Sequence, residues 1–175
     1  MKSPSCLVTN ANAVQGIYKE ALNLKKLRHK NIIELYNTFV EKKQMIMIME
    51  YAGGGELLGY LQRIKTMGEV ETRHIICQII NCINYCHTRG IVHRDLKLEN
   101  VIFRDPIQSE KPELQELFVK VIDFGIAGVC ENNRVDKGDA GSLCYMAPEC
   151  LKGKAAESNP AIDVWAIGIM FFALL

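Results

Sequence analysis

The sequence predicts a single α+β domain that covers residues 1–175, and three observations support this. The chain is long enough to bury one hydrophobic core, and 49% of its residues are apolar. Segments with strand character lie mostly early in the chain and helical patterns mostly late, which is typical of the α+β class. There is no internal repeat and no low-complexity stretch that would indicate a second unit.

The first part of the chain alternates helical and strand patterns. Apolar residues at helical spacing predict an amphipathic helix in residues 13–28. The segment Ile32–Val40 has strand character, and the wholly apolar run Met45–Met49 is typical of a buried strand. Gly53–Gly55 ends this strand. We expect a short helix from Glu56 to about Arg63.

The second part is dominated by helices. A long helix is predicted for residues 69–87 and is ended by Gly90. An apolar helix begins near Asp163, and we expect Trp165 and Met170 to pack into the core together with Leu174. The long helix should bury one face made of isoleucines, namely Ile75, Ile76, Ile79, Ile80 and Ile83.

Short strand patterns lie between these two helices. Ile91-Val92, Val101–Phe103 and Phe118–Ile122 have strand character. The segment Arg104–Glu116 is polar and contains two prolines, so we expect a surface loop. Residues 128–141 hold three glycines and many charges, which predicts another loop.

The charge balance excludes several classes of partner. There are 21 basic and 20 acidic residues, which gives a formal net charge of +1. This balance provides no field for nucleic acid or for an anionic membrane, so we expect no nucleic-acid binding. The apolar run Val164–Leu175 is shorter than the ~20 residues that a membrane-spanning helix needs, so we expect no membrane span.

The cysteines indicate a reducing compartment. There are seven cysteines, and no pair has the Cys-x-x-Cys spacing. The N-terminus lacks the basic start, apolar core and cleavage site of a secretory signal. We therefore expect free thiols and an intracellular location, in the cytoplasm or the nucleus.

Three short motifs follow one another in the second half of the chain. His93–Asn100 reads H-R-D-L-K-L-E-N, Asp123-Phe124-Gly125 follows a predicted strand, and Ala147-Pro148-Glu149 comes last. In this order they resemble the catalytic loop, the metal-binding motif and the end of the activation segment of the protein kinase family. The resemblance extends from about residue 14 to residue 175.

The resemblance implies ATP-dependent phosphoryl transfer to Ser or Thr hydroxyls of protein substrates, with ATP and Mg²⁺ as cofactors. Asp95 would be the catalytic base. Lys97 would contact the transferred phosphate, and a lysine at this position is typical of the Ser/Thr-specific kinases. Asn100 and Asp123 would bind magnesium, so the implied catalytic residues are Asp95, Lys97, Asn100 and Asp123.

Other positions match the family's nucleotide site. Glu20 matches the glutamate of helix C, and Lys2 would be its ATP-binding lysine if Met1-Lys2 ends a strand, the alternative being a solvated terminal lysine. Met49 matches the gatekeeper residue that precedes the hinge. The resemblance also implies that the hinge backbone of Glu50 and Ala52 binds the adenine edge and that Glu56 lies near the ribose. Leu57 and Ile102 would lie beneath the adenine, although both also suit an ordinary core.

The resemblance also assigns structural roles. Leu24, Leu35, His93 and Phe124 would form an apolar stack that joins the two lobes, so His93 would act in packing rather than as a base. Asp163 matches the helix F aspartate that anchors the catalytic loop, and Ser142 matches a residue that orients Asp95.

The implied fold is protein-kinase-like: a partial N-lobe with helix C and strands 4 and 5, and a truncated helical C-lobe that ends in helix F. Residues 1–50 would form the partial N-lobe, 51–55 the hinge and 56–175 the partial C-lobe. The family's glycine-rich loop has no counterpart in the sequence, so we expect the 175-residue chain itself to have little or no activity. The glycine-rich hinge and the sequence of the catalytic loop are similar to those of the calmodulin-dependent and AMP-activated kinases, which points to that group.

Two further departures leave alternatives open. Pro106–Leu117 looks like an inserted hairpin loop, and Gly138 stands where the family's phosphorylated threonine is usual, which argues against activation there. A pseudokinase or scaffold that binds nucleotide or partners without turnover is the main alternative, and a small-molecule phosphotransferase is a third. A regulatory protein or domain, of unknown identity, would be a further partner.

Overall fold

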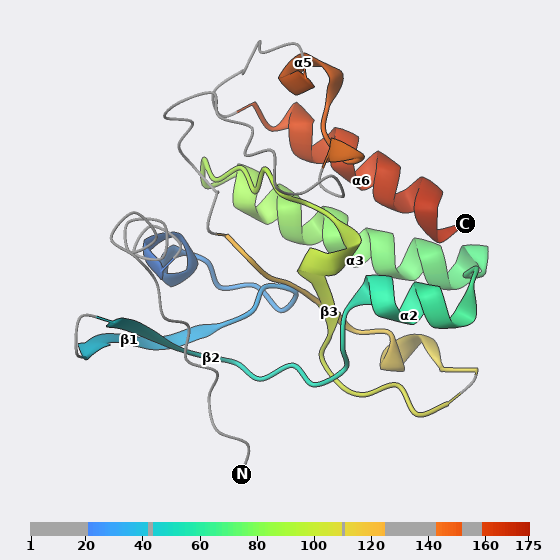
Figure 1. Ribbon diagram of the computed structural model, residues 1–175, viewed down its shortest axis with the longest axis horizontal. Coiled ribbons are helices and arrows are strands. Elements are labelled where there is room, and N and C mark those ends of the chain that lie inside the picture. Colours follow the sequence, from blue (N-terminus) through green and yellow to red (C-terminus); the bar gives the residue numbers. More distant parts are fainter. Residues whose placement is uncertain (1–20, 42–43, 110, 125–142, 152–158) are drawn as a thin grey trace.

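The computed structural model describes residues 21–41, 44–109, 111–124, 143–151 and 159–175 (Figure 1). Several predicted positions lie outside these ranges: Lys2, Glu20, the loop of residues 128–141, Gly138 and Ser142. The predictions for these positions therefore stay predictions.

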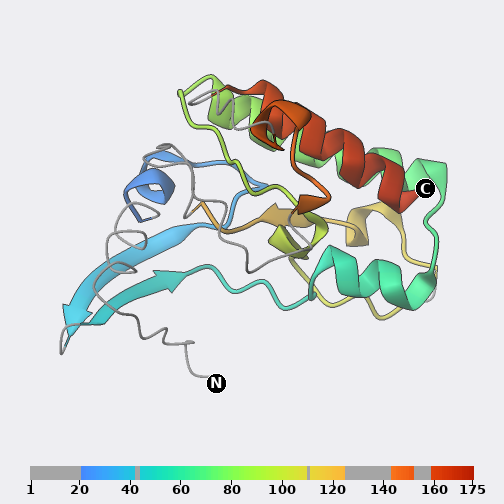
Figure 2. The ribbon, with the colours of Figure 1, turned by 45° about the horizontal axis from the view of Figure 1, so that its top comes forward.

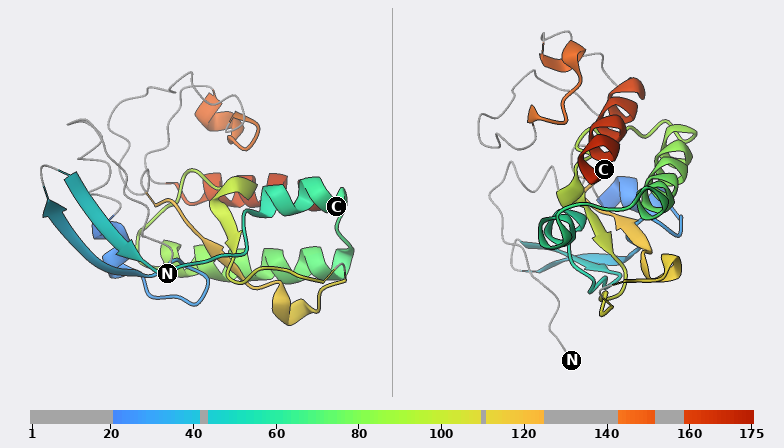
Figure 3. Two further views of the ribbon diagram at one scale, coloured as in Figure 1. Left: turned by 60° about the horizontal axis from the view of Figure 1, so that its bottom comes forward. Right: turned by 90° about the vertical axis from the view of Figure 1, so that its right-hand side faces the viewer.

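The first described part contains helical residues 21–26 and a two-stranded sheet. Strand β1, Leu35–Glu41, pairs antiparallel with β2, Gln44–Met49, with an irregularity in register between Leu35 and Asn37. Figure 3 shows this strand pair extending away from the helices.

Two predictions about this sheet are corrected. The strand predicted from Ile32 begins at Leu35, because Ile32 forms an isolated parallel bridge with Val121 instead. The run Met45–Met49 is half-buried to exposed rather than buried. Among the described residues each strand of this sheet has one strand neighbour only, so neither is the central strand that a wholly apolar run predicts.

The helical part is built on two long antiparallel helices. Helix α3, Glu69–His87, matches its predicted bounds, and α6, Ala161–Leu174, begins beside Asp163 as predicted. At one end the Met67 N–H donates to the Leu174 carbonyl at 3.1 Å, and at the other end His87 contacts Asp163. Figure 2 shows the two helices side by side. Helix α2, Leu57–Ile64, and the short α5, Pro148–Leu151, also lie in this part of the chain.

A small hairpin connects the catalytic motif to the metal-binding motif. Strand β3, Val101–Phe103, follows the single turn η1, Leu98–Asn100, and pairs antiparallel with β4, Val119–Val121. The connection between β3 and β4 includes a second turn, η2, Leu114–Glu116. The predicted surface loop is therefore the loop of a hairpin.

One predicted strand and two predicted core positions are wrong. Ile91-Val92 is buried but is not part of a strand. Ile80 is 47% exposed, because a rotation of about 100° per residue carries it to the edge of the α3 face on which Ile75, Ile79 and Ile83 are buried. Trp165 is 45% exposed, whereas Met170 and Leu174 of the same helix are fully buried as predicted.

The core lies where the hairpin, α3 and the segment of residues 29–33 meet. Asn31 is fully buried, and its amide Nδ2 donates to Gln78 Oε1 of α3 at 2.9 Å and to the Val119 carbonyl of β4 at 2.8 Å. Through these two hydrogen bonds of its Nδ2, Asn31 holds the segment against both elements. No helix in the described ranges is long and apolar enough to cross a bilayer.

Candidate active site

The catalytic-motif loop is held by a buried carboxylate. Asp163 is 1% exposed and accepts hydrogen bonds from the backbone N–H groups of His93 and Arg94, each at 2.8 Å. His87 Nε2 lies 2.7 Å from the same carboxylate. A buried carboxylate needs several donors to offset its lost hydration. The prediction that Asp163 anchors this loop is confirmed.

Two residues of the site have left-handed backbone conformations. Arg94 has φ 73° and Asp123 has φ 62°. Such conformations are unfavourable for residues other than glycine and persist when surrounding contacts impose them. For Arg94, the hydrogen bond of its N–H to Asp163 is one of these contacts. The strained positions directly precede Asp95 and coincide with Asp123.

His93 is a packing and hydrogen-bonding residue, as predicted. Its ring is fully buried and lies 4.7 Å from the ring of Phe124, centroid to centroid. Nδ1 accepts from the Asp95 N–H at 3.3 Å, so Nε2 carries the proton that it donates to the Ile122 carbonyl at 3.0 Å. Burial lowers the pKa of His93, although the nearby Asp163 opposes this. The neutral ring therefore has both nitrogens occupied.

The other members of the predicted apolar stack lie in the same core. Leu24 and Phe124 are buried in it, and Leu35 is half-buried against it.

Three of the predicted catalytic side chains lie together. Lys97 Nζ is 3.1 Å from Asp95 Oδ2. Asn100 Nδ2 donates to the same Oδ2 at 3.0 Å and to the Asp95 carbonyl at 2.7 Å. The side chains of Asp95 and Lys97 are 17% and 14% exposed, so both are partly shielded yet reachable from solvent. The carboxylate is thus oriented by one cation and one amide.

Asp123 is brought next to this group through its neighbour Ile122. The Ile122 N–H donates to the Asn100 carbonyl at 2.9 Å, and its own carbonyl accepts from His93. Asp123 is the next residue, and it is exposed at the end of β4. The backbone of the metal-binding motif is therefore fastened to the catalytic loop at two points.

The donor set suits a hard cation. Asn100 uses its amide nitrogen toward Asp95, which leaves its oxygen Oδ1 as the atom able to act as a ligand. Asp123 supplies a carboxylate. The described residues contain no group of three or more His, Cys, Asp or Glu that could hold a metal. One carboxylate and one amide oxygen are instead typical of magnesium that is also bound by phosphates and water.

The predicted hinge joins β2 to α2. Met49 is the last residue of β2 and is 39% exposed. The Glu50 N–H donates to the Glu34 carbonyl at 2.8 Å, so only its carbonyl is available to a ligand. In the described ranges, the N–H and carbonyl of Ala52 have no protein hydrogen-bond partner. Both groups suit the edge of a base.

The remaining predicted nucleotide contacts surround the hinge. Glu56 is exposed and precedes α2, and it forms an isolated bridge with Ile102. Ile102 is half-buried, whereas Leu57 is fully buried in the core. Leu57 therefore acts as a core residue in the structure, one of the two readings that its sequence left open.

Sequence reasoning missed the side chains of Lys120 and Glu50. Lys120 Nζ lies 2.7 Å from Glu50 Oε2, and their side chains are only 9% and 18% exposed. The signal was a lysine between two valines of a strand, Val119 and Val121, since a charge at the centre of an apolar strand needs a partner.

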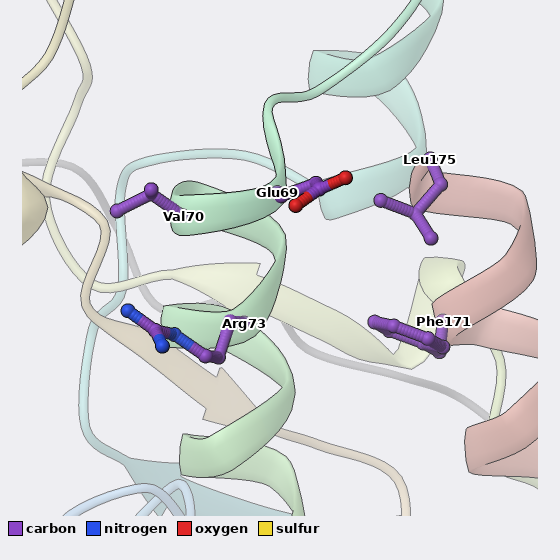
Figure 4. A pocket seen from close by; sticks show the side chains of 5 residues that line it. All are labelled: Glu69, Val70, Arg73, Phe171 and Leu175. Atoms are coloured by element: carbon purple, nitrogen blue, oxygen red, sulfur yellow. The ribbon is translucent and has the colours of Figure 1, made fainter.

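An open hollow elsewhere does not belong to this site. It lies between the start of α3 and the end of α6 and is lined by Glu69, Val70, Arg73, Phe171 and Leu175 (Figure 4). The catalytic loop follows the opposite end of α3, which has 19 residues and is therefore about 28 Å long. The hollow contains none of the predicted catalytic residues.

Comparison with known proteins identifies similar chains. The model of the family described as protein kinase domain matches residues 6–175. The chain is 40% identical to the SNF1-like protein kinase ssp2 of Schizosaccharomyces pombe over 97% of its own length and 27% of that protein's. It is 35% identical to the NUAK family SNF1-like kinase 1 of Mus musculus, over 91% of the chain and 22% of that protein. It is 34% identical to the calcium-dependent protein kinase 5 of Plasmodium berghei, over 94% of the chain and 27% of that protein. The chain spans about a quarter of the length of these relatives.

Proposed function

The chain belongs to the protein kinase domain family, and on that premise we propose that it is a Ser/Thr protein kinase domain. The reaction would transfer the γ-phosphate of ATP to a Ser or Thr hydroxyl of a protein, with ADP as the second product. Support for the Ser/Thr class comes from Lys97 and from the similarity to SNF1-like and calcium-dependent kinases.

The observation that carries the proposal is the arrangement around Asp95. Its carboxylate is held by Lys97 at 3.1 Å and by Asn100 at 3.0 Å. The backbone of the same loop is fixed by its hydrogen bonds to the Asp163 carboxylate. Phosphoryl transfer depends mainly on positioning and on charge neutralisation, and a pre-oriented carboxylate beside a lysine meets both needs.

Each residue would have a distinct role. Asp95 would orient the substrate hydroxyl and accept its proton as the bond to phosphorus forms. Lys97 would neutralise charge on the transferred phosphoryl group, and Asn100 Oδ1 and Asp123 would hold magnesium. The bound Mg²⁺ would supply charge neutralisation at the phosphates of ATP. The backbones of Glu50 and Ala52 would hydrogen-bond the adenine edge above Ile102.

The alternative is a protein that binds nucleotide or partners without turnover. The intact set of Asp95, Lys97, Asn100 and Asp123 favours catalysis. A regulatory partner of unknown identity stays part of either proposal, as does an intracellular location.

The test uses the natural protein that contains these 175 residues. We expect Mg²⁺-dependent incorporation of labelled γ-phosphate into Ser or Thr of a generic basic peptide. Asp95→Asn should lower the rate by about 10²- to 10⁴-fold, the usual contribution of a positioned base, with Mg·ATP binding retained. Incorporation that Asp95→Asn leaves unchanged would exclude the assigned mechanism. Mg·ATP binding without incorporation would support the alternative.

A further inference from the structure

One buried ion pair joins the predicted hinge to the strand that leads to Asp123. Lys120 lies in β4, three residues before Asp123, and its Nζ is 2.7 Å from Glu50 Oε2. Another ion pair at this distance, Arg104–Asp105, joins neighbouring residues and is mostly exposed. The Lys120–Glu50 pair instead connects positions 70 residues apart.

Glu50 is held from several directions. Its Oε2 also accepts from the Glu34 N–H at 3.2 Å, while its own N–H donates to the Glu34 carbonyl at 2.8 Å. With its N–H and its carboxylate both occupied, the peptide group of Glu50 has a defined orientation. Its carbonyl is the group left to face a ligand.

The position of Lys120 in the hairpin directs it toward the same region. In the β3–β4 register, Lys120 is the direct partner of Ile102. Directly opposed residues of an antiparallel pair extend from the same face. Lys120 therefore shares a face with Ile102, the residue proposed to lie beneath the adenine. The Ile32 carbonyl, 3.5 Å from Nζ, adds a second acceptor.

We propose that Lys120 is a positioning residue for adenine-nucleotide binding: its ion pair with Glu50 holds the hinge backbone in place over Ile102. This proposal rests on the proposed function, because it assumes that the hinge binds adenine. Lys120 would not contact the nucleotide itself. It would act through Glu50, so its loss should weaken nucleotide binding more than it slows transfer.

The test measures Mg·ADP affinity by calorimetry in the natural protein that contains this chain. Lys120→Met keeps an apolar stem and removes the charge, and it should weaken Mg·ADP binding about tenfold, because a half-buried Glu50 is left unpaired and free to reorient. In the transfer assay the KM for ATP should rise by a similar factor while kcat changes by less than about twofold, the pattern of lost ground-state binding. Lys120→Arg should restore most of the affinity.

Two further variants separate positioning from mere stabilisation. The double variant Lys120→Met with Glu50→Gln leaves no unpaired charge, so it should regain stability against urea. Its Mg·ADP affinity should nevertheless stay low, because the ion pair that orients the peptide group of residue 50 is absent. Asp105→Asn removes the acidic partner of an exposed pair of equal length and should change neither quantity.

Each outcome decides the matter. A double variant that regains both stability and affinity would show that Lys120 only stabilises the fold, and the proposal would be wrong. Unchanged or tighter Mg·ADP affinity of Lys120→Met would also show that the proposal is wrong, while the proposed function would stand. A wild-type protein that does not bind Mg·ADP would overturn both. Lys120-dependent binding without phosphate transfer would support the inference and exclude the kinase reaction.

Discussion

Asp163 is the residue on whose carboxylate the geometry of the catalytic loop depends most. It accepts from two consecutive backbone N–H groups at 2.8 Å and contacts His87 at 2.7 Å. Asp163→Asn would place the NH₂ group of the amide against one of these N–H or imidazole donors. That donor would then be buried without an acceptor. We expect a loss of about 2–3 kcal/mol in the free energy of unfolding, measured by urea denaturation.

The matched control is Asp105→Asn, whose carboxylate forms an exposed ion pair with Arg104. This change should alter stability by less than about 0.5 kcal/mol. Equal effects of the two substitutions would contradict the anchoring role of Asp163.

Burial of the neutral His93 predicts how stability depends on pH. Burial lowers the pKa of His93 below its ordinary value of 6.5 in the folded protein. Between the lowered pKa and 6.5, the unfolded chain binds a proton that the folded chain does not bind. Stability therefore increases with pH through this window and is lost as pH falls through it. The free energy of unfolding should decrease between about pH 7 and about pH 5.

The test of this pH dependence is the variant His93→Phe. It should reduce the slope of stability against pH, even if it lowers stability at every pH. Part of the slope should persist, because burial also lowers the pKa of His29. An identical slope in the variant would rule out His93 as a source.

At the scale of elements, the hinge is fastened to β3 and to the residue after it by backbone hydrogen bonds, and the contact at Gly54 requires glycine. The Gly53 and Gly54 N–H groups donate to the carbonyls of Arg104 and Phe103, each at 3.0 Å. A Cβ at Gly54 would lie 2.3 Å from the Asp105 carbonyl oxygen and 2.4 Å from Phe103 Cβ. Gly54→Ala should therefore displace the hinge and cost about 1–3 kcal/mol of stability, measured by thermal unfolding.

The control for this substitution lies in the next element. Gly59 is inside α2, and a Cβ there would meet nothing within 4 Å. Gly59→Ala should stabilise the protein by about 0.5–1 kcal/mol, because alanine favours the helix. If Gly54→Ala were as well tolerated, the close approach of hinge and β3 would not matter.

Elements with a strong local pattern were predictable from the sequence. The bounds of α3 follow from its isoleucine spacing and from Gly90, and β3 follows from its apolar run between polar segments. Burial was less predictable. Ile80 and Met45–Met49 are apolar but partly exposed, because burial depends on which neighbours cover a face, and local sequence does not contain this information.

The candidate site divides in the same way. Asp95, Lys97 and Asn100 are close in sequence, so one turn brings them together and a motif can reveal them. The pairing of Lys120 with Glu50 joins positions 70 residues apart and appears only in the fold. Lys120 was recognisable as unusual within its strand, but its partner was not.

At the scale of the whole molecule, the surface of α6 is unusually apolar. Phe172 is 82% exposed, Val164 is 62% exposed, and Trp165 and Phe171 are 45% and 42% exposed. A helix that is apolar on all sides is typical of the interior of a protein, and exposed apolar patches promote association. We therefore expect the 175-residue chain to self-associate as its concentration rises, which sedimentation velocity would detect.

The substitutions that test this expectation change the apolar surface without touching the core. The double variant Val164→Lys with Phe172→Lys replaces exposed side chains of α6, so it should shift the chain toward monomer and leave Met170 buried. The control is Val40→Lys, which changes a residue of β1 that is 73% exposed but lies far from α6 in the chain. If Val40→Lys reduced association as strongly as the α6 variant, the association would come from general hydrophobicity and not from the surface of α6.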